Sequence, residues 1–231
     1  MRKLFLLAFI FSNAIFAQGL VGDGFNDQIS DNTGIISIAP ATKKNVNIEG
    51  TPYINDNFLP VKITSFEDKN FQARFNAYNG DMEVLDITSG TVYVLNKSIK
   101  NYNVTFIGTN TSYSVYQHID EDGYVTKAFF ITLTSNNGLT LIKKEKVQFL
   151  GERVATSTYD KARPAMYKRG NDRYYIKIGD TDAKPFSTKK KDIVREFSSN
   201  SKKILSFIKE NKLKTSKEED LIKVINFISS L

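Results

Sequence analysis

Apolar and polar residues alternate along most of the chain after residue 51, with the period of two that is typical of a half-buried β-strand. In the segment 71–78, for example, Phe71, Ala73 and Phe75 alternate with polar side chains. The pattern recurs in the segments 82–87, 90–95, 103–108, 112–119, 123–135, 139–151, 166–170 and 173–179. Short links separate these runs, so the sequence predicts about nine or ten strands in an antiparallel meander.

Asn79-Gly80 lies between the first two of these strands and predicts a tight hairpin, because a type I′ turn needs a positive φ at both central residues. Asp81 and Glu83 follow directly, and we expect them on the solvent-exposed face of the second strand. Two catalytic carboxylates would have to converge across a cleft, and this local spacing provides none. The stretch therefore favours a strand and turn over an acid–base pair.

The hydrophobic period changes near the C-terminus to that of an amphipathic helix. Apolar residues recur there at i, i+3 and i+4 steps, namely Ile204, Phe207 and Ile208, then Leu221, Val224, Ile225 and Ile228. Thr215 with Glu218, or Ser216 with Glu219, would form a capping box before the last of these helices. The apolar faces of the helices are expected to pack on the sheet.

These elements together predict an α+β fold. A meander of about nine or ten strands has to curl or close, so we expect a half-barrel or barrel, with a closed sandwich as the alternative. Two or three C-terminal helices then pack on it. Residues 49–231 form a single domain in this interpretation, β-rich over 51–180 and helical over 188–231.

The N-terminus has the pattern of an export signal. Arg2 and Lys3 precede an apolar run over residues 4–11, and the small residue Ala17 follows at a position suited to cleavage. The run is too short to span a bilayer, which needs about 20 apolar residues. Residues 1–17 are therefore predicted to be a signal peptide. Residues 18–48 are predicted to be a flexible extension in which GIISIA forms at most one strand.

The chain contains no cysteine, which excludes disulfides, thiol catalysis, cysteine-bound metals and a bacterial lipoprotein anchor. A signal peptide without other long apolar runs predicts a periplasmic or extracellular protein with no transmembrane segment. Charge is unevenly distributed, with a net charge of −5 over residues 18–141 and +10 over residues 142–231. The basic half could therefore face an anionic partner, or the acidic half of the same chain.

Several segments occur in an order that is familiar from one group of proteins. They are EGTPYINDNFLPVKI, ARFNAYNGDMEVL, LIKKEKVQF, DRYYIKIG with KKKDIVREF, and IKENKLKTSKEEDLIKVINFISSL. The set resembles exported, uncharacterised proteins from Bacteroidota with GSPYLN-like, RYNxYxDEMEV-like and C-terminal NKLKLKKEEDLIK-like motifs. The resemblance covers residues 49–231 and departs at NFISSL, where the group tends to have Tyr-Tyr-Asn. It implies an exported bacterial protein and carries over no catalytic residue.

Candidate catalytic and metal-binding residues are few. The single histidine, His118, could in principle form a triad with Ser114 and Asp120, but no GxSxG nucleophile elbow occurs, so a strand residue near a turn is favoured. The segment 120–123 is rich in carboxylates but lacks the spacing of a calcium loop. One histidine without cysteine disfavours zinc, and no phosphate-binding glycine motif is present. We therefore predict no catalytic set, no metal site and no cofactor.

Basic and aromatic residues are interleaved in the C-terminal half of the sheet, where they could bind a ligand or an anionic surface. The candidates are Tyr167, Lys168, Arg169, Arg173, Tyr174 and Lys177. Such a mixture also suits single-stranded nucleic acid, but export makes that partner improbable and favours lipid headgroups or polysaccharide. An ordinary solvated surface explains the pattern as well.

Three functions remain open. A non-catalytic binding protein with an apolar or lipid-like ligand, or an envelope protein as partner, is favoured, because aromatic-rich strands occur without a catalytic set. A structural or assembly component of the cell envelope is the close alternative. A hydrolase that uses two carboxylates ranks third, and it would require two acids that face each other in a cleft.

Overall fold

The computed structural model describes residues 35–37, 48–64, 66, 71–98, 101–109, 111–120, 122–157 and 159–231. The predicted signal peptide, residues 1–17, and most of the predicted extension lie outside the described residues. The GIISIA segment does contain a strand, β1 (Ile35–Ser37), which pairs with β5 at one edge of the sheet.

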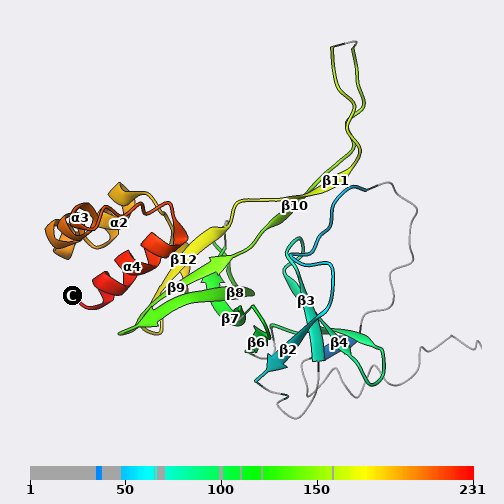
Figure 1. Ribbon diagram of the computed structural model, residues 1–231, viewed down its shortest axis with the longest axis horizontal. Coiled ribbons are helices and arrows are strands. Elements are labelled where there is room, and N and C mark those ends of the chain that lie inside the picture. Colours follow the sequence, from blue (N-terminus) through cyan, green and yellow to red (C-terminus); the bar gives the residue numbers. More distant parts are fainter. Residues whose placement is uncertain are drawn as a thin grey trace, which may run out of the picture.

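Eleven antiparallel strands form one sheet in the order β1-β5-β4-β3-β2-β6-β7-β8-β9-β12-β13 (Figure 1). The first half contains β2 (Leu59–Ile63), β3 (Phe71–Asn76), β4 (Asp81–Asp86), β5 (Val92–Leu95) and β6 (Asn103–Phe106). The second half contains β7 (Ser112–Ile119), β8 (Val125–Asn136), β9 (Leu139–Lys144), β12 (Arg173–Ile178) and β13 (Lys184–Phe186). The α+β class and the antiparallel strands followed by helices are confirmed.

The sheet consists of two meanders. Strands β2 to β5 follow one another in space, the chain then returns so that β6 lies beside β2, and β6 to β9 form the second meander. The sheet is neither closed nor strongly curled, because β1 and β13 occupy its opposite edges. The predicted half-barrel or barrel is therefore wrong, and a single sheet of this size also argues against the sandwich. The C-terminal helices cover apolar surface that closure would otherwise have buried.

The Asn-Gly turns do not all behave as predicted. Between β8 and β9, Asn137 and Gly138 both have positive φ, 47° and 76°, as a type I′ turn requires. Between β3 and β4 only Gly80 has a positive φ, and four residues separate the paired Asn76 and Asp81. The Asn76 carboxamide oxygen accepts hydrogen bonds from two backbone N–H groups of this turn, which stabilises the longer loop.

Glu83 on β4 is buried, at 7 % exposure, which corrects the expectation that it faces solvent. Arg74 of β3 forms an ion pair of 2.7 Å with it, and the Tyr53 hydroxyl donates a hydrogen bond of 3.1 Å. The Arg74 guanidinium in turn lies over the rings of Tyr53 and Phe58. The segment 51–58 therefore covers this part of the sheet. As a result, consecutive residues of β4 are buried although they point to opposite faces.

Three apolar clusters hold the sheet and the helices together. The first lies on one face of the sheet, extends from β5 to β8, and includes Ile63, Ala73, Phe75, Met82, Val84, Leu95, Val104, Tyr113 and Phe129. The second lies on the same face farther along, and joins Leu139, Leu141 and Ile176 to the helices through Ile193, Ile204, Leu221, Val224 and Ile225. The third lies on the opposite face and contains Ala128, Phe130, Ile142, Tyr175 and Ala183.

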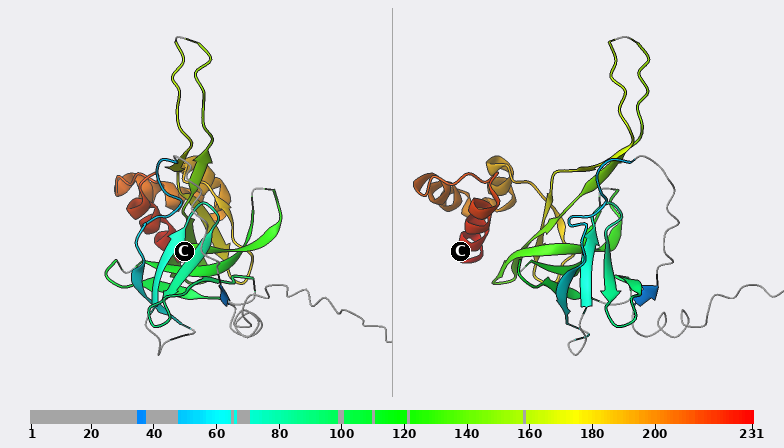
Figure 2. Two further views of the ribbon diagram at one scale, coloured as in Figure 1. Left: turned by 90° about the vertical axis from the view of Figure 1, so that its right-hand side faces the viewer. Right: turned by 45° about the vertical axis from the view of Figure 1, so that its right-hand side comes forward.

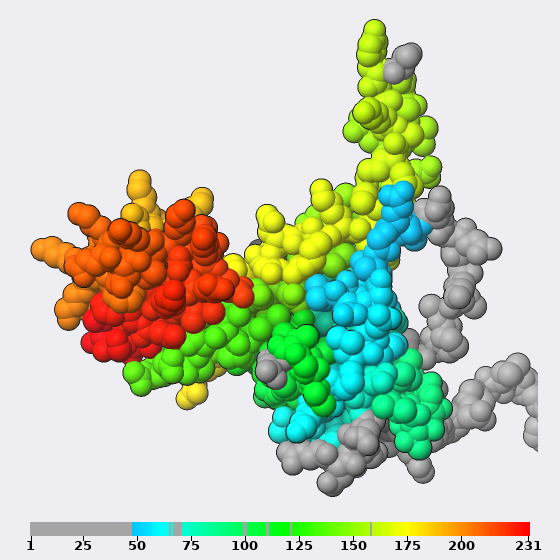
Figure 3. Space-filling model, viewed as in Figure 1, coloured from blue at the N-terminus to red at the C-terminus, as the bar shows by residue number. Residues whose placement is uncertain are grey.

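Between β9 and β12 the chain forms a long hairpin that projects from the body (Figures 1 and 3). Its paired base consists of β10 (Val147–Leu150) and β11 (Met166–Arg169). Glu49 lies beside β11, since its N–H donates to Ala165 O at 2.9 Å and Tyr167 N–H donates to its carbonyl at 2.8 Å. We call residues 147–169 the arm.

Three helices follow the sheet and pack on its β8–β9–β12 end (Figure 2). They are α2 (Lys190–Glu196), α3 (Ser201–Glu210) and α4 (Glu218–Ser229), with a 3-10 turn, η1 (Ser198–Asn200), before α3. The predicted capping box is absent, because α4 begins after Lys217 and has no side-chain cap. Among the described helices, none has the length and apolar character needed to cross a bilayer.

Candidate functional site

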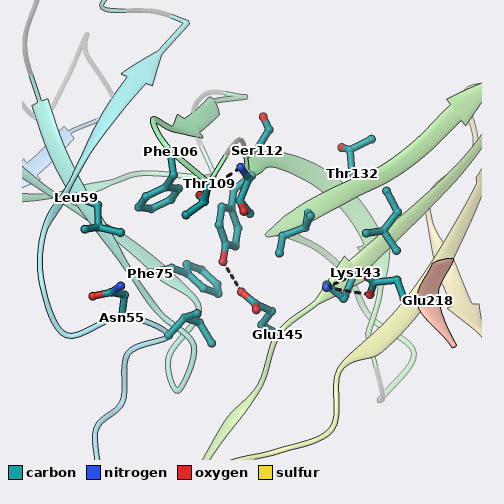
Figure 4. Close-up of a pocket in the computed structure, with 15 residues that line it drawn as sticks. Asn55, Leu59, Phe75, Phe106, Thr109, Ser112, Thr132, Lys143, Glu145 and Glu218 are labelled. Carbon is teal, nitrogen blue, oxygen red and sulfur yellow. Dashed lines mark hydrogen bonds and ion pairs between the residues drawn. The ribbon is translucent and has the colours of Figure 1, made fainter. Parts of the chain in front are cut away.

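A cavity of about 420 Å³ lies on the helix-covered face of the sheet, between the first and second apolar clusters (Figure 4). Strands β2, β3, β6, β7, β8 and β9 and the first turn of α4 contribute to its wall. It is lined by Ile54, Asn55, Leu59, Phe75, Phe106, Thr109, Thr111, Ser112, Tyr113, Ile131, Thr132, Leu133, Lys143, Glu145 and Glu218. We call it the sheet cavity.

One wall of the sheet cavity is apolar. Leu59, Phe75 and Phe106 point into it from the first half of the sheet (Figure 4). From β8 come Ile131 and Leu133, which lie at either side of Thr132. The register between β8 and β9 shifts between Thr132 and Thr134, so Leu133 is the extra residue of a β-bulge. The bulge changes the direction of this part of β8, which lines the cavity.

The opposite wall is polar because of the alternation along β9. Leu139 and Leu141 point under the helices, and the same parity places Lys143 and Glu145 in the cavity wall. The Glu145 side chain is 10 % exposed and accepts hydrogen bonds from the Tyr113 hydroxyl and, at 3.1 Å, from Arg169. Arg169 also forms an ion pair with Asp172.

Lys143 connects the sheet to the last helix. Its ammonium forms an ion pair of 2.9 Å with Glu218 and lies 3.9 Å from Asp172. The Tyr174 hydroxyl donates a second hydrogen bond of 3.0 Å to Glu218. Burial, followed by the negative charge of Glu218, raises the pKa of Tyr174 to about 12, so the phenol remains a donor at neutral pH.

Glu145 and Glu218 line the same cavity, which is the arrangement that a carboxylate hydrolase would need. Burial raises the pKa of Glu145, as in a general acid. However, each carboxylate already accepts hydrogen bonds at both of its oxygens, from Tyr113 and Arg169 in one case and from Lys143 and Tyr174 in the other. Such bonding is typical of groups that hold elements together. Neither carboxylate has an oxygen without a hydrogen-bond partner from the protein.

The predicted candidate residues on β11 and β12 do not share one surface. Successive residues of a strand point to opposite faces, so Tyr174 contacts the helix cluster while Tyr175 lies in the cluster on the other face. Tyr167 packs against Tyr78 and Phe149 at the base of the arm, with ring centroids 5.3 Å away in both cases. Binding of an anionic surface by the predicted group stays a prediction.

The remaining members of that group have separate partners and positions. Lys168 lies on β11 and pairs in register with Gln148. Arg169 donates to Glu145 in the polar wall of the sheet cavity, and Arg173 lines a second cavity, which shares Phe75 and Glu145 with the first. Lys177 donates to the carbonyl of Gly179 in the next turn.

The residues that could have formed a triad bond to other partners instead. His118 is 1 % exposed, and its Nδ1 lies 3.0 Å from Thr126 O. The Ser114 hydroxyl accepts a hydrogen bond from Asn103, and an Asp120 oxygen accepts from the N–H groups of Asp122 and Tyr124. Glu121 lies outside the described residues, and among those described no three acidic or histidine side chains are grouped to hold a metal ion.

The polar wall of the sheet cavity was not predicted from the sequence. Tyr113, Lys143 and Glu218 belong to three elements that are distant along the chain, so no local motif contains them. One signal was present in the segment LIKKEKVQF, where Glu145 is the single acid among lysines and continues the inward parity of Leu139 and Leu141. No family model matches the chain, and neither the curated proteins nor the solved structures contain a significant match to it.

Proposed function

We propose that this chain is a non-catalytic binding protein, exported to the bacterial cell envelope, which holds a small apolar or lipid-like ligand in the sheet cavity. The observation that carries the proposal is the pairing of Glu145 and Glu218 with cationic and hydroxyl groups of the wall itself. Because the charged groups of this wall pair with one another, an uncharged ligand can bind beside them without leaving a buried charge unpaired. The volume of about 420 Å³ lies within the range of small-molecule pockets.

The chemistry of the walls defines the ligand further. Leu59, Phe75 and Phe106 offer an apolar contact surface on one side. The polar side chains of Asn55, Thr109 and Thr111 also line the cavity and can exchange hydrogen bonds with a polar end. We therefore expect an amphipathic molecule with one apolar body and one uncharged polar end. Export is supported by the residue pattern of positions 1–17.

Native mass spectrometry of the gently purified protein tests the proposal. We expect a discrete added mass in the wild type that is lost in Leu59→Trp, because the larger ring fills the cavity. Leu205→Trp on α3 is the matched control, since Leu205 is 42 % exposed and distant from the cavity lining. A bare monomer, together with no binding of fatty alcohols or monoacylglycerols to the wild type, would overturn the proposal.

The arm supports a second candidate function, a structural or assembly component of the envelope. It extends away from the body, and Val154 and Tyr159 on it are 70 % and 99 % exposed (Figure 3). Exposed apolar side chains on a projecting hairpin are suited to contact another protein. Crosslinking from position 159 in intact envelopes tests this candidate, and it fails if no specific protein adduct forms at that position.

A further inference from the structure

The outer part of the arm exposes apolar side chains on a hairpin with little support of its own. Beyond the paired base, Arg153 and Arg163 exchange two backbone hydrogen bonds, of 2.7 and 2.8 Å, and the hairpin extends away from the body (Figure 3). Val154 and Tyr159 near its tip are 70 % and 99 % exposed. An isolated two-stranded hairpin is at best marginally stable in water, so a partner that packs against this part would stabilise it.

The arm also keeps a positive charge after its ion pairs are taken into account. Among the described residues, acids form ion pairs with two of its five basic side chains, those of Arg153 and Arg169. The other three are Lys161, Arg163 and Lys168, and the one acid of the arm outside these pairs is Glu152. Lys161 is exposed and lies two residues from Tyr159, so a cation and an aromatic ring are presented together near the tip.

The turn between β7 and β8 has the opposite charge. Residues 119–125 contain three acids and no base, and we call them the acidic turn. Asp122 is exposed, and none of the described basic residues forms an ion pair with it. Tyr124 and Val125 follow it and are 70 % and 54 % exposed. The acidic turn therefore presents an anion beside exposed apolar side chains.

Asp120 has an internal role in the acidic turn. Its carboxylate accepts hydrogen bonds from the backbone N–H groups of Asp122 and Tyr124, which hold the turn. Its negative charge also acts on His118 and Lys144 within the molecule. Among the described acids of the turn, Asp122 is thus the one that is available to a partner.

We propose that the arm of one copy of this chain docks on the acidic turn of a second copy. The two segments match, because each combines exposed apolar side chains with charge of opposite sign. Within one molecule, no hydrogen bond or ion pair of the described residues joins them. Around a twofold axis the contact occurs twice, which gives a closed dimer. The inference rests on the second candidate function, for which it names the partner, and it is independent of a ligand in the sheet cavity.

Sedimentation velocity of the purified protein over a range of concentrations measures this association. We expect a dimer at low salt that dissociates at about 1 M salt, because exposed charges are then screened. Lys161→Glu and Asp122→Lys should each weaken dimerisation about tenfold or more, since each places like charges in both contacts. Lys203→Glu, at an exposed position on α3, is the matched control and should dimerise as the wild type does.

A mixture of the two reversed variants tests whether these two surfaces meet. In a mixed dimer one contact has the wild-type residues on both sides, and in the other contact the reversed arm meets the reversed turn. Mixing equal amounts of Lys161→Glu and Asp122→Lys should therefore restore association, although each variant alone is mainly monomeric. A wild-type monomer at every concentration, a dimer that neither reversal weakens, or a mixture that stays monomeric would overturn the proposal.

Two further variants separate this inference from the proposals above. Tyr159→Ser removes the exposed ring without a change of charge and should also weaken the dimer about tenfold, so a test remains if a reversed variant does not fold. Leu59→Trp fills the sheet cavity and should dimerise as the wild type does, whatever it does to ligand binding. Crosslinks from position 159 to other envelope proteins but not to a second copy would support the second candidate function and overturn the inference.

Discussion

His118 Nε2 and Lys144 Nζ lie 3.4 Å apart, so the one imidazole of the chain faces a cation. The other ring nitrogen lies 3.0 Å from Thr126 O, and a carbonyl only accepts hydrogen bonds. The ring therefore carries its proton on Nδ1, and Nε2 accepts from the lysine. The Phe130 and Tyr175 rings contact the same imidazole. A buried, neutral histidine is what this environment stabilises.

Stability should fall as the pH falls below the ordinary pKa of histidine. Burial, followed by the charge of Lys144, lowers the pKa of His118 below 6.5. Between these two pKa values the unfolded chain binds a proton that the folded protein does not, so the free energy of unfolding decreases with decreasing pH. Urea unfolding at a series of pH values, with NMR titration of the single imidazole, measures the effect. His118→Phe should show a flatter dependence in this range, and an equal slope in both proteins would contradict the assignment.

Arg74→Met should destabilise the protein by about 3 kcal/mol, because it leaves the Glu83 carboxylate buried without its cation. The Glu83 side chain is 9 % exposed and that of Arg74 is 23 % exposed. Arg195→Met is the matched control on α2, where the Arg195 side chain is 81 % exposed, and it should cost less than about 1 kcal/mol. Urea unfolding of both variants gives the comparison. Equal losses would mean that the Arg74–Glu83 pair behaves as a surface pair.

Gly50→Ala should loosen the base of the arm. A Cβ atom at this position would lie 2.4 Å from Tyr167 O, and Gly50 has a φ of +73°. Gly90 has a similar φ of +70°, and nothing lies within 4 Å of its Cβ position. Gly90→Ala should therefore lower the free energy of unfolding only by the cost of a left-handed backbone conformation, about 1–2 kcal/mol.

Hydrogen exchange at the Tyr167 amide, which donates to Glu49 O, reports the effect directly. We expect faster exchange in Gly50→Ala and unchanged exchange in Gly90→Ala. Unchanged exchange in both variants would show that the chain beside β11 tolerates a shift, and that the close approach is not required.

Leu221→Ala should destabilise the protein by about 2–5 kcal/mol, because it opens a space between α4 and the sheet. Leu221 is fully buried in the second apolar cluster, whereas Leu205 on α3 is 42 % exposed. Leu205→Ala should therefore change stability by less than about 1 kcal/mol, since both residues favour helices. Thermal unfolding of the two variants tests the prediction. A small loss in Leu221→Ala would indicate that the helices are not an integral part of the folded domain.

The turn residues illustrate how far local chemistry reaches. Asn137 and Gly138 adopt the positive φ values that a two-residue turn requires, as their sequence predicts. Asn79 and Gly80 have the same sequence pattern but only Gly80 adopts a positive φ. The difference arises because the Asn76 side chain accepts hydrogen bonds from two backbone N–H groups of the turn. The Asn-Gly pattern alone does not include this residue.

Glu83 illustrates the limit of strand alternation. Its parity on β4 was consistent with a solvent-exposed face, but residues 51–58 return over that face and bury it. A pattern within one strand records which positions alternate. Which face is covered depends on segments that are remote along the chain.

The sequence by itself determined the α+β class, most strand segments and the positions of the helices, because hydrophobic periodicity and turn residues act within a few residues. The tertiary structure alone decided that the sheet stays open and that Tyr113, Lys143, Glu145 and Glu218 meet in one wall. It also decided that lysines from several elements line a second cavity of about 250 Å³. These features depend on long-range strand order, the bulge at Leu133 and the departure of β9 from β8, and the free energy that selects them comes from packing between distant segments.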